Sequence, residues 1–356
     1  NRCYLVLLGL AALIVPPLTA ARESTWTAPK YTHTPIQPPG GFPVVVDGGN
    51  PINNEGVVSA DAGFGNSCQA SKAFVYFRKT HRYVVFGNPP SLTAATPTFS
   101  IGIDDRERVG VNAFNCANSR TSIYLVRVSG STTQWSHPCM CNGYVAVGIN
   151  SDGIGLNSRK LGPAVLTFPN GVPHIQPLSI DVGDPSAAEI RGAGTPVGFV
   201  GTQRSTRTHK NVPTAWLNGS PHVLPAVHAS NPPVPVAMDE HLTRTGLTLD
   251  VAGYFPVVDE TDYWRGRPAA GGFAFAEHRG FIRSRDMRQV TGMSTNGSII
   301  FGDRGDPDTL IVYYTRTHAE THSGGGCGNW GGAWGDSHGD ILVSTDHTCL
   351  AQPEGQ

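Results

Sequence analysis

Short apolar runs recur along the chain from residue 44 to its end, and turn-forming residues separate them. Valine, isoleucine, tyrosine and phenylalanine are enriched in these runs, and glycine, proline, asparagine or aspartate bounds them, which is typical of β-strands. No window carries a sustained apolar stripe at helical spacing. The best helical candidates, residues 186–190 and 239–244, are short. The expected strands cover residues 44–46, 73–77, 83–86, 99–103, 123–128, 144–149, 197–200, 247–251, 272–276, 298–301, 310–314 and 341–344.

This rhythm predicts an all-β fold, and many short strands are typical of a sandwich, a barrel or a propeller. Residues 44–356 are expected to form the β-rich domain. Within it, residues 201–236 differ, because threonine, histidine, proline and asparagine dominate and apolar runs are scarce. We interpret them as a long surface excursion or as a boundary between two halves.

The N-terminal segment has the pattern of an export signal. The apolar run 5–18 is broken by Pro16 and Pro17, and Thr19 and Ala21 are small residues at the spacing that signal peptidase accepts. The alternative is a retained membrane anchor, but the unbroken apolar stretch is shorter than the roughly 20 residues of a spanning helix. We therefore expect residues 1–21 to be a signal peptide, and a secreted or cell-surface protein without a membrane span after cleavage.

Residues 22–43 are rich in proline and threonine and have no period, which predicts an extended or poorly ordered lead-in.

Composition and charge narrow the class of partner that the protein can bind. Charged residues make up 15% of the chain and its net charge is −1, so nothing favours nucleic-acid binding by phosphate neutralisation. Asn218 and Asn296 begin glycosylation sequons, which predict a glycoprotein where the source has that machinery.

The cysteines after the expected signal are even in number, which favours disulfides in an exported chain. Cys139 and Cys141 are separated by one residue, so each is expected to pair elsewhere. Cys327 and Cys349 bracket a glycine-rich loop and the last strand, and a bond between them would contribute about 3 kcal/mol. We predict that bond. The alternative is that each pairs with one of the four upstream cysteines, Cys68, Cys116, Cys139 and Cys141.

Three strand-turn segments look alike: residues 144–153 (YVAVGINSDG), 292–301 (GMSTNGSIIF) and 340–347 (DILVSTDH). Each places serine and aspartate or asparagine in a tight turn beside a β run. They resemble the Asp-box of sialidase-like (BNR-repeat) propellers, whose pattern is Ser-x-Asp-x-Gly-x-x-Trp. Residues 97–135 are similar to a blade of that family. The resemblance favours a β-propeller, with a β-sandwich as the alternative, and implies that the boxes are turns between outer strands.

The same resemblance implies a set of candidate catalytic residues. A sialidase-like glycosidase needs arginines for the substrate carboxylate, which a guanidinium binds with two parallel bonds, and a tyrosine nucleophile with a glutamate partner. The densest arginine group lies at residues 277–288 and two tyrosines follow it. The alternative is a solvated basic edge. The candidates are Glu277, Arg279, Arg283, Tyr313 and Tyr314.

The glycine-rich segment 324–339 presents two tryptophans, Trp330 and Trp334. Flat aromatic faces stack on sugars or on a partner surface, so both are candidate ligand-binding residues. The alternative is that they fold back onto the core.

Three histidines in the C-terminal quarter, His318, His322 and His338, lie close in sequence to Asp336 and Asp340. Imidazole and carboxylate are common metal ligands, so these histidines are candidate ligands. Apart from Ca²⁺ or another divalent metal, the sequence indicates no cofactor.

Two functions are consistent with these patterns. The first is an exported glycan-directed propeller, either a binder or a sialidase-like hydrolase, and the sequence does not decide whether it is an enzyme. The hydrolase requires at least two arginines at the central channel beside a tyrosine. The alternative is a non-enzymatic structural or adhesive surface protein of envelope, appendage or capsid type. Glycans or cell-surface molecules are the expected partners. The sequence leaves open whether the protein forms a homo-oligomer.

Overall fold

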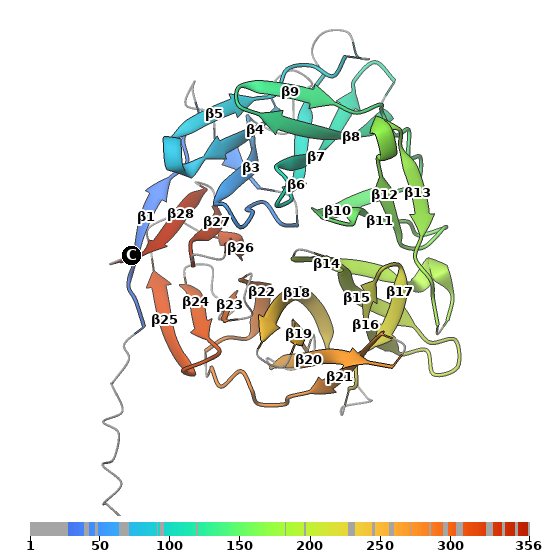
Figure 1. Ribbon diagram of the computed structural model, residues 1–356, viewed down its shortest axis with the longest axis vertical. Helices are drawn as coiled ribbons and strands as arrows, with labels where there is room; N and C mark the ends of the chain where they lie inside the picture. Colours follow the sequence, from blue (N-terminus) through green and yellow to red (C-terminus); the bar gives the residue numbers. More distant parts are fainter. Residues whose placement is uncertain are drawn as a thin grey trace, which may run out of the picture.

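Four-stranded β-sheets arranged radially around a central axis make up the computed structural model (Figure 1). Five sheets have four strands each, and one has eight. The eight-stranded sheet is two antiparallel four-stranded sets that join where β14 (Glu189–Thr195) and β18 (Val234–Thr243) pair in parallel over two residues. The described residues therefore form seven blades. The prediction of an all-β propeller is confirmed, and the sandwich alternative is wrong because the sheets radiate from an axis.

The structure describes residues 28–38, 43–46, 49–63, 71–90, 92, 96–118, 120–181, 183–195, 197–226, 232–243, 246–255, 260–270, 272–284, 286–294, 298–303, 309–324, 330–336, 339–345 and 348–354. Within these ranges only the backbone is described for residues 195, 241–243, 309, 323–324, 330–332 and 344–345.

Each blade runs from an innermost strand at the axis to an outermost strand at the rim. In that order, blade 1 holds β2 (Val44–Val45), β3 (Val57–Ala62), β4 (Lys72–Phe77) and β5 (Arg82–Val85), and blade 2 holds β6 (Thr98–Ile103), β7 (Arg108–Asn115), β8 (Arg120–Ser129) and β9 (Thr132–Trp135). Blade 3 holds β10 (Val145–Asn150), β11 (Gly153–Asn157), β12 (Ala164–Thr167) and β13 (His174–Pro177), and blade 4 holds β14, β15 (Phe199–Arg204), β16 (Asn211–Leu217) and β17 (Ser220–Val223). Blade 5 holds β18, β19 (Gly246–Tyr254), β20 (Thr261–Ala269) and β21 (Gly272–Glu277), and blade 6 holds β22 (Gln289–Met293), β23 (Ile299–Asp303), β24 (Thr309–Tyr314) and β25 (Ala319–Gly324). Blade 7 holds β26 (Trp330–Gly335), β27 (Ile341–Thr345), β28 (Cys349–Pro353) and β1 (Tyr31–Pro35).

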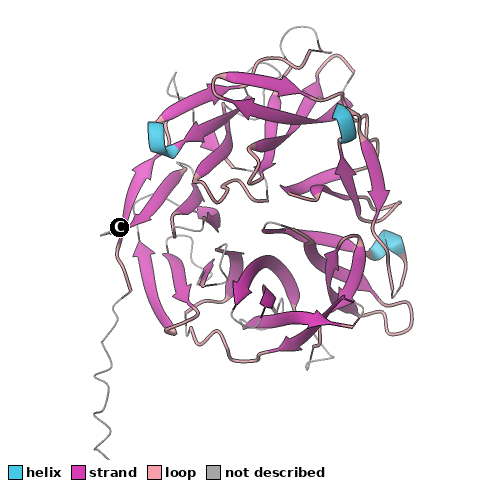
Figure 2. Ribbon diagram, viewed as in Figure 1, coloured by secondary structure: helices cyan, strands magenta, loops and turns pink. Residues whose placement is uncertain are grey.

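The helical structure in the described residues is three short 3-10 turns: η1 (Arg78–Thr80), η2 (Pro169–Gly171) and η3 (Pro185–Ala187) (Figure 2). The helical candidates are mostly wrong. Residues 239–243 belong to β18, where antiparallel pairing with β19 overrides local preference. Of residues 186–190, only the first two are in a 3-10 turn. No helix among the described residues is long and apolar enough to span a membrane.

Both ends of the chain build blade 7. The strand β1 pairs antiparallel with β28, so residues 31–35 lie beside residues 349–353 (Figure 1). The Tyr31 hydroxyl also hydrogen-bonds the Tyr314 hydroxyl of blade 6 at 2.8 Å. Part of the predicted lead-in is therefore the outermost strand of the last blade. Residues 201–236, which the sequence suggested to be a surface excursion or a boundary between halves, contain the regular strands β16 and β17 of blade 4.

The hydrophobic core is distributed between neighbouring blades. One cluster joins blade 1 to blade 7 through residues such as Val58, Phe74 and Leu342, all fully buried. A second joins blade 5 to blade 6 and contains Tyr263 and Ile311. Because each sheet buries both of its faces against neighbours, the ring is stable only when every blade is in place.

Five consecutive inner strands, β6, β10, β14, β18 and β22, carry a β-bulge at the same place. In four of them a glycine follows the bulged residue, and in β18 it is alanine. A Cβ added to Gly292 would lie 2.5 Å from the Ala333 carbonyl oxygen of β26, and one added to Gly192 would clash with the Val236 carbonyl of β18. These glycines let adjacent inner strands touch backbone to backbone.

A polar side chain closes most of the hairpins after these strands. The Asp104 carboxylate accepts hydrogen bonds from the backbone N–H groups of Arg106 (2.9 Å) and Arg108 (2.8 Å), and Asn150 accepts one from Asp152 at 2.9 Å. Segments 144–153 and 292–301 thus lie on hairpins between the first and second strands of their blades. The outer-strand position that the Asp-box resemblance implied is wrong for these two, because the same turn chemistry serves an inner hairpin.

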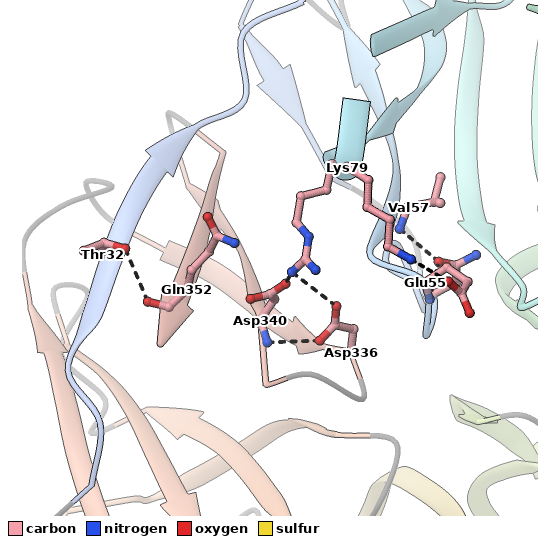
Figure 3. Close-up of polar contacts among 9 residues, drawn as sticks. Thr32, Glu55, Val57, Lys79, Asp336, Asp340 and Gln352 are labelled. Carbon is pink, nitrogen blue, oxygen red and sulfur yellow. Dashed lines mark hydrogen bonds and ion pairs between the residues drawn. The ribbon is translucent and has the colours of Figure 1, made fainter. Parts of the chain in front are cut away.

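A buried ion-pair cluster links blade 1 to blade 7. Arg78 of η1 forms an ion pair with Asp340 and lies 3.9 Å from the Asp336 carboxylate. The Asp340 N–H donates to Asp336 Oδ1 at 3.0 Å, and Asp336 is fully buried. Figure 3 shows both carboxylates at the turn after β26, facing blade 1. We call Arg78, Asp336 and Asp340 the Arg78 cluster. It is a second connection between the first and last blades.

We expect Arg78→Gln to lower the free energy of unfolding by about 3 kcal/mol, because it leaves two buried carboxylates without their cation. Lys79→Gln is the matched control, since the neighbouring Lys79–Glu55 pair is mostly exposed and should contribute at most about 1 kcal/mol. Urea unfolding of both variants measures the difference. Equal effects of the two substitutions would contradict a closing role for the Arg78 cluster.

Candidate binding site in the central channel

A cavity of about 400 Å³ lies where the inner strands converge. This volume is within the range of about 300–1,000 Å³ that is typical of ligand sites. Its walls come from the inner strands of blades 3 to 7, from residues 49–52 of blade 1, and from Tyr254 at the end of β19. The channel therefore is a concave site built from nearly the whole ring.

The bulges bring four of the lining side chains into this cavity. The bulged residues of β10, β14, β18 and β22 are Val147, Arg191, Val236 and Thr291, and all four line it. A bulge turns its extra residue out of the regular alternation of a strand. The same β-bulge, repeated in four inner strands around the axis, thus brings one side chain from each strand into the wall of the cavity.

Polar groups gather at the end of the channel where the inner strands begin. Gln289 is the first residue of β22, and Tyr254 pairs with Val234 at the start of β18. Arg191 is about half exposed, and its guanidinium lies 2.8 Å from the Glu189 carboxylate, which is equally exposed. Such an exposed pair is weak, so a ligand carboxylate can compete for the guanidinium.

Thr291 adds a hydroxyl that is buried in the wall of the cavity. Its Oγ1 makes no hydrogen bond to any described residue. A buried hydroxyl without a partner is unfavourable, so this position calls for water or a ligand hydroxyl. Farther along the channel the wall is largely apolar, with Met238, Met293 and Trp334.

The two candidate tryptophans belong to β26. Trp334 is partly buried, packs against the core between blades 1 and 7 and also lines the cavity, and its role in ligand binding stays a prediction. Trp330 begins β26, but its side chain lies outside the described residues. Its role in ligand binding stays a prediction.

Of the two candidate tyrosines, Tyr313 is buried and Tyr314 is partly buried, and neither lines the wall of the channel. The Tyr313 hydroxyl donates to the Phe281 carbonyl at 2.9 Å, accepts from the Arg283 N–H at 3.1 Å, and lies 2.6 Å from His318 Nδ1. Burial raises the pKa of Tyr313 and of Tyr314, which is opposite to what a phenolate nucleophile needs. In this structure the hydroxyls of both tyrosines hydrogen-bond other segments. Tyr313 bonds Phe281 in the segment after β21, and Tyr314 bonds Tyr31 of β1.

Arg279 and Arg283 are exposed on the segment that links β21 to β22. Neither lines the cavity, and Arg191 is the one described arginine that does. The convergence of two arginines beside a tyrosine, which a sialidase-like hydrolase requires, is therefore not formed by the described residues.

Glu277, the remaining catalytic candidate, forms a carboxyl pair with Asp262. Asp262 is buried at the start of β20, and Glu277 ends the neighbouring strand β21. Burial raises the pKa of Asp262 to about 7, and the charge of Glu277 and a hydrogen bond to it act in the same direction. Neither residue lines the channel cavity. The pair holds a proton near neutral pH.

The candidate metal ligands are separated in the structure. His318 is in the turn before β25 and hydrogen-bonds Tyr313, whereas Asp336 and Asp340 belong to the Arg78 cluster. His322 lies on β25 beside Asp286 and Glu320. His338 lies outside the described residues.

Cys139 and Cys141 are bonded to each other, so the expectation that each pairs elsewhere is wrong. Their Cα atoms are 5.2 Å apart, within the span of a disulfide, because the chain bends between a bridge to Ile123 and the following turn. Cys349 is disulfide-bonded and buried in β28. Cys327 lies outside the described residues, so the Cys327–Cys349 bond stays a prediction.

The sequence reasoning missed Arg191, Gln289 and Thr291. The usable signal was a repeat in which an apolar residue and then aspartate, asparagine or serine follow a glycine. It occurs at Gly102, Gly148 and Gly292, and the first two are 46 residues apart. Propeller blades repeat at about 40–50 residues, so a search for this period would have aligned these hairpins and selected the residue before each glycine, Thr291 among them. It would not have selected Arg191 or Gln289, because the pattern is absent at both places.

The Asp262–Glu277 pair predicts a pH dependence of stability. A carboxyl whose pKa rises from about 3.9 in the unfolded chain to about 7 in the fold makes the folded state bind more protons between these values. Its contribution is full below pH 4 and declines up to pH 7, by at most about 1.4 kcal/mol per pH unit. We expect Asp262→Asn to flatten this decline in urea unfolding between pH 5 and 8. A variant with the wild-type slope would contradict the assignment.

No protein-family model matches the chain, and no curated protein matches its sequence. Solved structures do match. One is an oligogalacturonate lyase in complex with manganese, with 9% identity and a TM-score of 0.51, over 93% of this chain and 99% of that one. Another is the extracellular domain assigned to a hybrid two-component system of B. thetaiotaomicron, with 12% identity and a TM-score of 0.50, over 91% of this chain.

The chain spans 40% of the length of that extracellular-domain chain. At these identities the likenesses show the fold alone. Both neighbours are propellers, so the comparisons agree with the radial arrangement of the blades.

Proposed function

We propose that this chain is an exported glycan-binding propeller that takes a carboxylate-bearing oligosaccharide into the central channel. The observation that carries the proposal is the cavity of about 400 Å³ with Arg191 and Gln289 near one end and Trp334 in its wall. Sites for small molecules combine an apolar wall with a few placed polar groups. A sugar ring presents the matching surfaces, since it has hydroxyls at its edge and apolar C–H groups on its faces.

The polar groups of the cavity suit hydroxyl-rich ligands. Gln289 can offer an amide donor and acceptor, and Tyr254 and Thr291 offer hydroxyls. The unpartnered Thr291 hydroxyl in particular would gain a hydrogen bond from a ligand. Without such a ligand, no described residue satisfies it, and water is the remaining partner in the cavity.

Arg191 selects the acidic class of glycan. Its planar guanidinium can bind a carboxylate with two parallel hydrogen bonds, and among the described residues only the exposed Glu189 competes for it. A uronic acid or a sialic acid carries such a group. The oligogalacturonate lyase of similar fold acts, by its name, on a sugar of this kind, which agrees with the proposal.

The proposal is limited to binding. Catalysis of the sialidase type needs further arginines and an activated tyrosine at the channel, whereas Arg191 is alone among the described lining residues and Tyr313 is occupied in hydrogen bonds within blade 6 and its linker. Burial also raises the pKa of Tyr313. A glycan-binding role needs none of these groups.

Isothermal titration of the secreted protein with oligogalacturonides and sialyl-oligosaccharides tests the proposal. We expect saturable binding of one of these acidic series, and a loss of at least about 10-fold in affinity for Arg191→Gln, because a charge-assisted pair is removed. Arg207→Gln, an exposed residue of the same blade outside the cavity, is the matched control and should bind normally. The uncharged methyl ester of the bound sugar should bind the wild type as weakly as the acid binds Arg191→Gln.

Two results would overturn the proposal. One is the absence of binding to any acidic or neutral oligosaccharide, which together with ordered oligomers in size-exclusion chromatography would favour a structural or adhesive surface protein. The other is binding that Arg191→Gln leaves unchanged, which would place the ligand outside the channel.

A further inference from the structure

Asp286, Glu320 and His322 form a group of metal-ligating side chains away from the central channel. One ligand atom of each lies within 4.8 Å of the other two. Glu320 and His322 belong to β25, the outermost strand of blade 6. Asp286 belongs to the segment that runs from blade 5 to β22. None of the three lines the channel cavity.

The fold brings this group together in two ways. Glu320 and His322 are two residues apart on a strand, so both point to the same face of the sheet. Their partners in β24 are Tyr313 and Ile311, which belong to the core between blades 5 and 6.

The linking segment crosses that same face. Met287 belongs to the same core as Tyr313 and Ile311. The Ser284 hydroxyl accepts hydrogen bonds from the N–H groups of Asp286 (3.3 Å) and Met287 (2.9 Å), which turns the chain beside β25. Asp286 is thereby held opposite the two strand residues.

We infer that these three side chains bind one Zn²⁺ ion. His322 Nε2 lies 3.4 Å from Glu320 Oε1 and 3.6 Å from Asp286 Oδ2. Zinc bonds of about 2.0–2.2 Å to imidazole and carboxylate place neighbouring donors of a tetrahedron about 3.3–3.6 Å apart. The two distances therefore match two edges of a tetrahedral site before any side chain moves.

The donor set also selects the ion. Ca²⁺ and Mg²⁺ take oxygen ligands, so an imidazole in the group disfavours both. A mixed set of one imidazole and two carboxylates suits Zn²⁺. The three side chains are between 28% and 38% exposed, which leaves the fourth position open to water.

The charges of Asp286 and Glu320 favour a bound cation in this group of side chains. Two carboxylates converge here, and the second oxygen of Glu320 is buried and accepts no hydrogen bond from any described residue. A bound dication would neutralise both carboxylates and give that oxygen a partner. Without metal, a hydrogen bond between His322 and Glu320 is the competing state.

Zinc at this position would join the segment between blades 5 and 6 to the outer edge of blade 6. Three protein ligands from two segments cross-link the chain locally, so binding should stabilise the fold by mass action. The inference is independent of glycan binding in the channel.

The test uses the full secreted chain, free of any histidine tag and stripped with EDTA, and titrates it with ZnCl₂ by calorimetry at pH 7.5. We expect one site per chain, with affinity reduced at least about 100-fold in His322→Gln and in Glu320→Gln. His174→Ala, an exposed histidine on the outermost strand of blade 3, is the matched control and should bind as the wild type. CaCl₂ and MgCl₂ should show no comparable binding.

Thermal unfolding gives a second readout. Saturating Zn²⁺ should raise the Tm of the wild type and of His174→Ala, but not that of His322→Gln, whose Tm without metal shows whether it folds. Zn²⁺ binding that His322→Gln and Glu320→Gln leave unchanged would overturn the inference. So would a wild type without saturable binding, in which case His322 acts only as a hydrogen-bond partner of Glu320.

Discussion

The close approach of the inner strands is the constraint on which the rest of the structure depends. At Gly192 and Gly292 a side chain would meet a carbonyl of the next inner strand, so only glycine permits this spacing. The bulge before each glycine supplies the local change of direction. A ring of this kind has a narrow channel. The bulges turn Arg191 and Thr291 toward it, whereas Gln289 and Tyr254 reach it from the ends of strands. Part of the site therefore has the same origin as the scaffold.

Closure of the ring is the second requirement, because the core lies between blades and each blade needs two neighbours. The strand β1 completes blade 7, and the Arg78 cluster joins the same two blades on a different element. One connection is a ladder of backbone hydrogen bonds and the other is electrostatic. The ladder between β1 and β28 forms only when the N-terminal segment is in place. The Arg78 cluster lies within residues 78–340, and its strength depends on burial of the charges.

Much of the fold can be predicted from the sequence, and the candidate site cannot. Runs such as residues 73–77 and 310–314 identify strands because valine, tyrosine and phenylalanine suit a buried sheet. The Asx-turn chemistry at Asn150 and Ser294 was also visible, although its place in the blade was not. Arg191, by contrast, is one arginine in a run of small residues, and only the tertiary bulge turns it into the channel. Tyr313 is the opposite case. The sequence shows a tyrosine that could be catalytic, but it does not show that the fold buries this side chain.

The repeated bulge also explains how one ring can carry varied chemistry. At equivalent positions β10, β14, β18 and β22 place valine, arginine, valine and threonine, while the glycine or alanine that follows keeps the strand spacing. Val147 and Val236 also pack against the cores beside them, so their identity serves both the fold and the channel. Arg191 is half exposed and lies outside these cores, so its identity is free to follow the ligand. Gly192, which follows it, is fixed by contact with the neighbouring strand. In β14, adjacent positions are thus constrained by different interactions, one by the fold and one by whatever the channel binds.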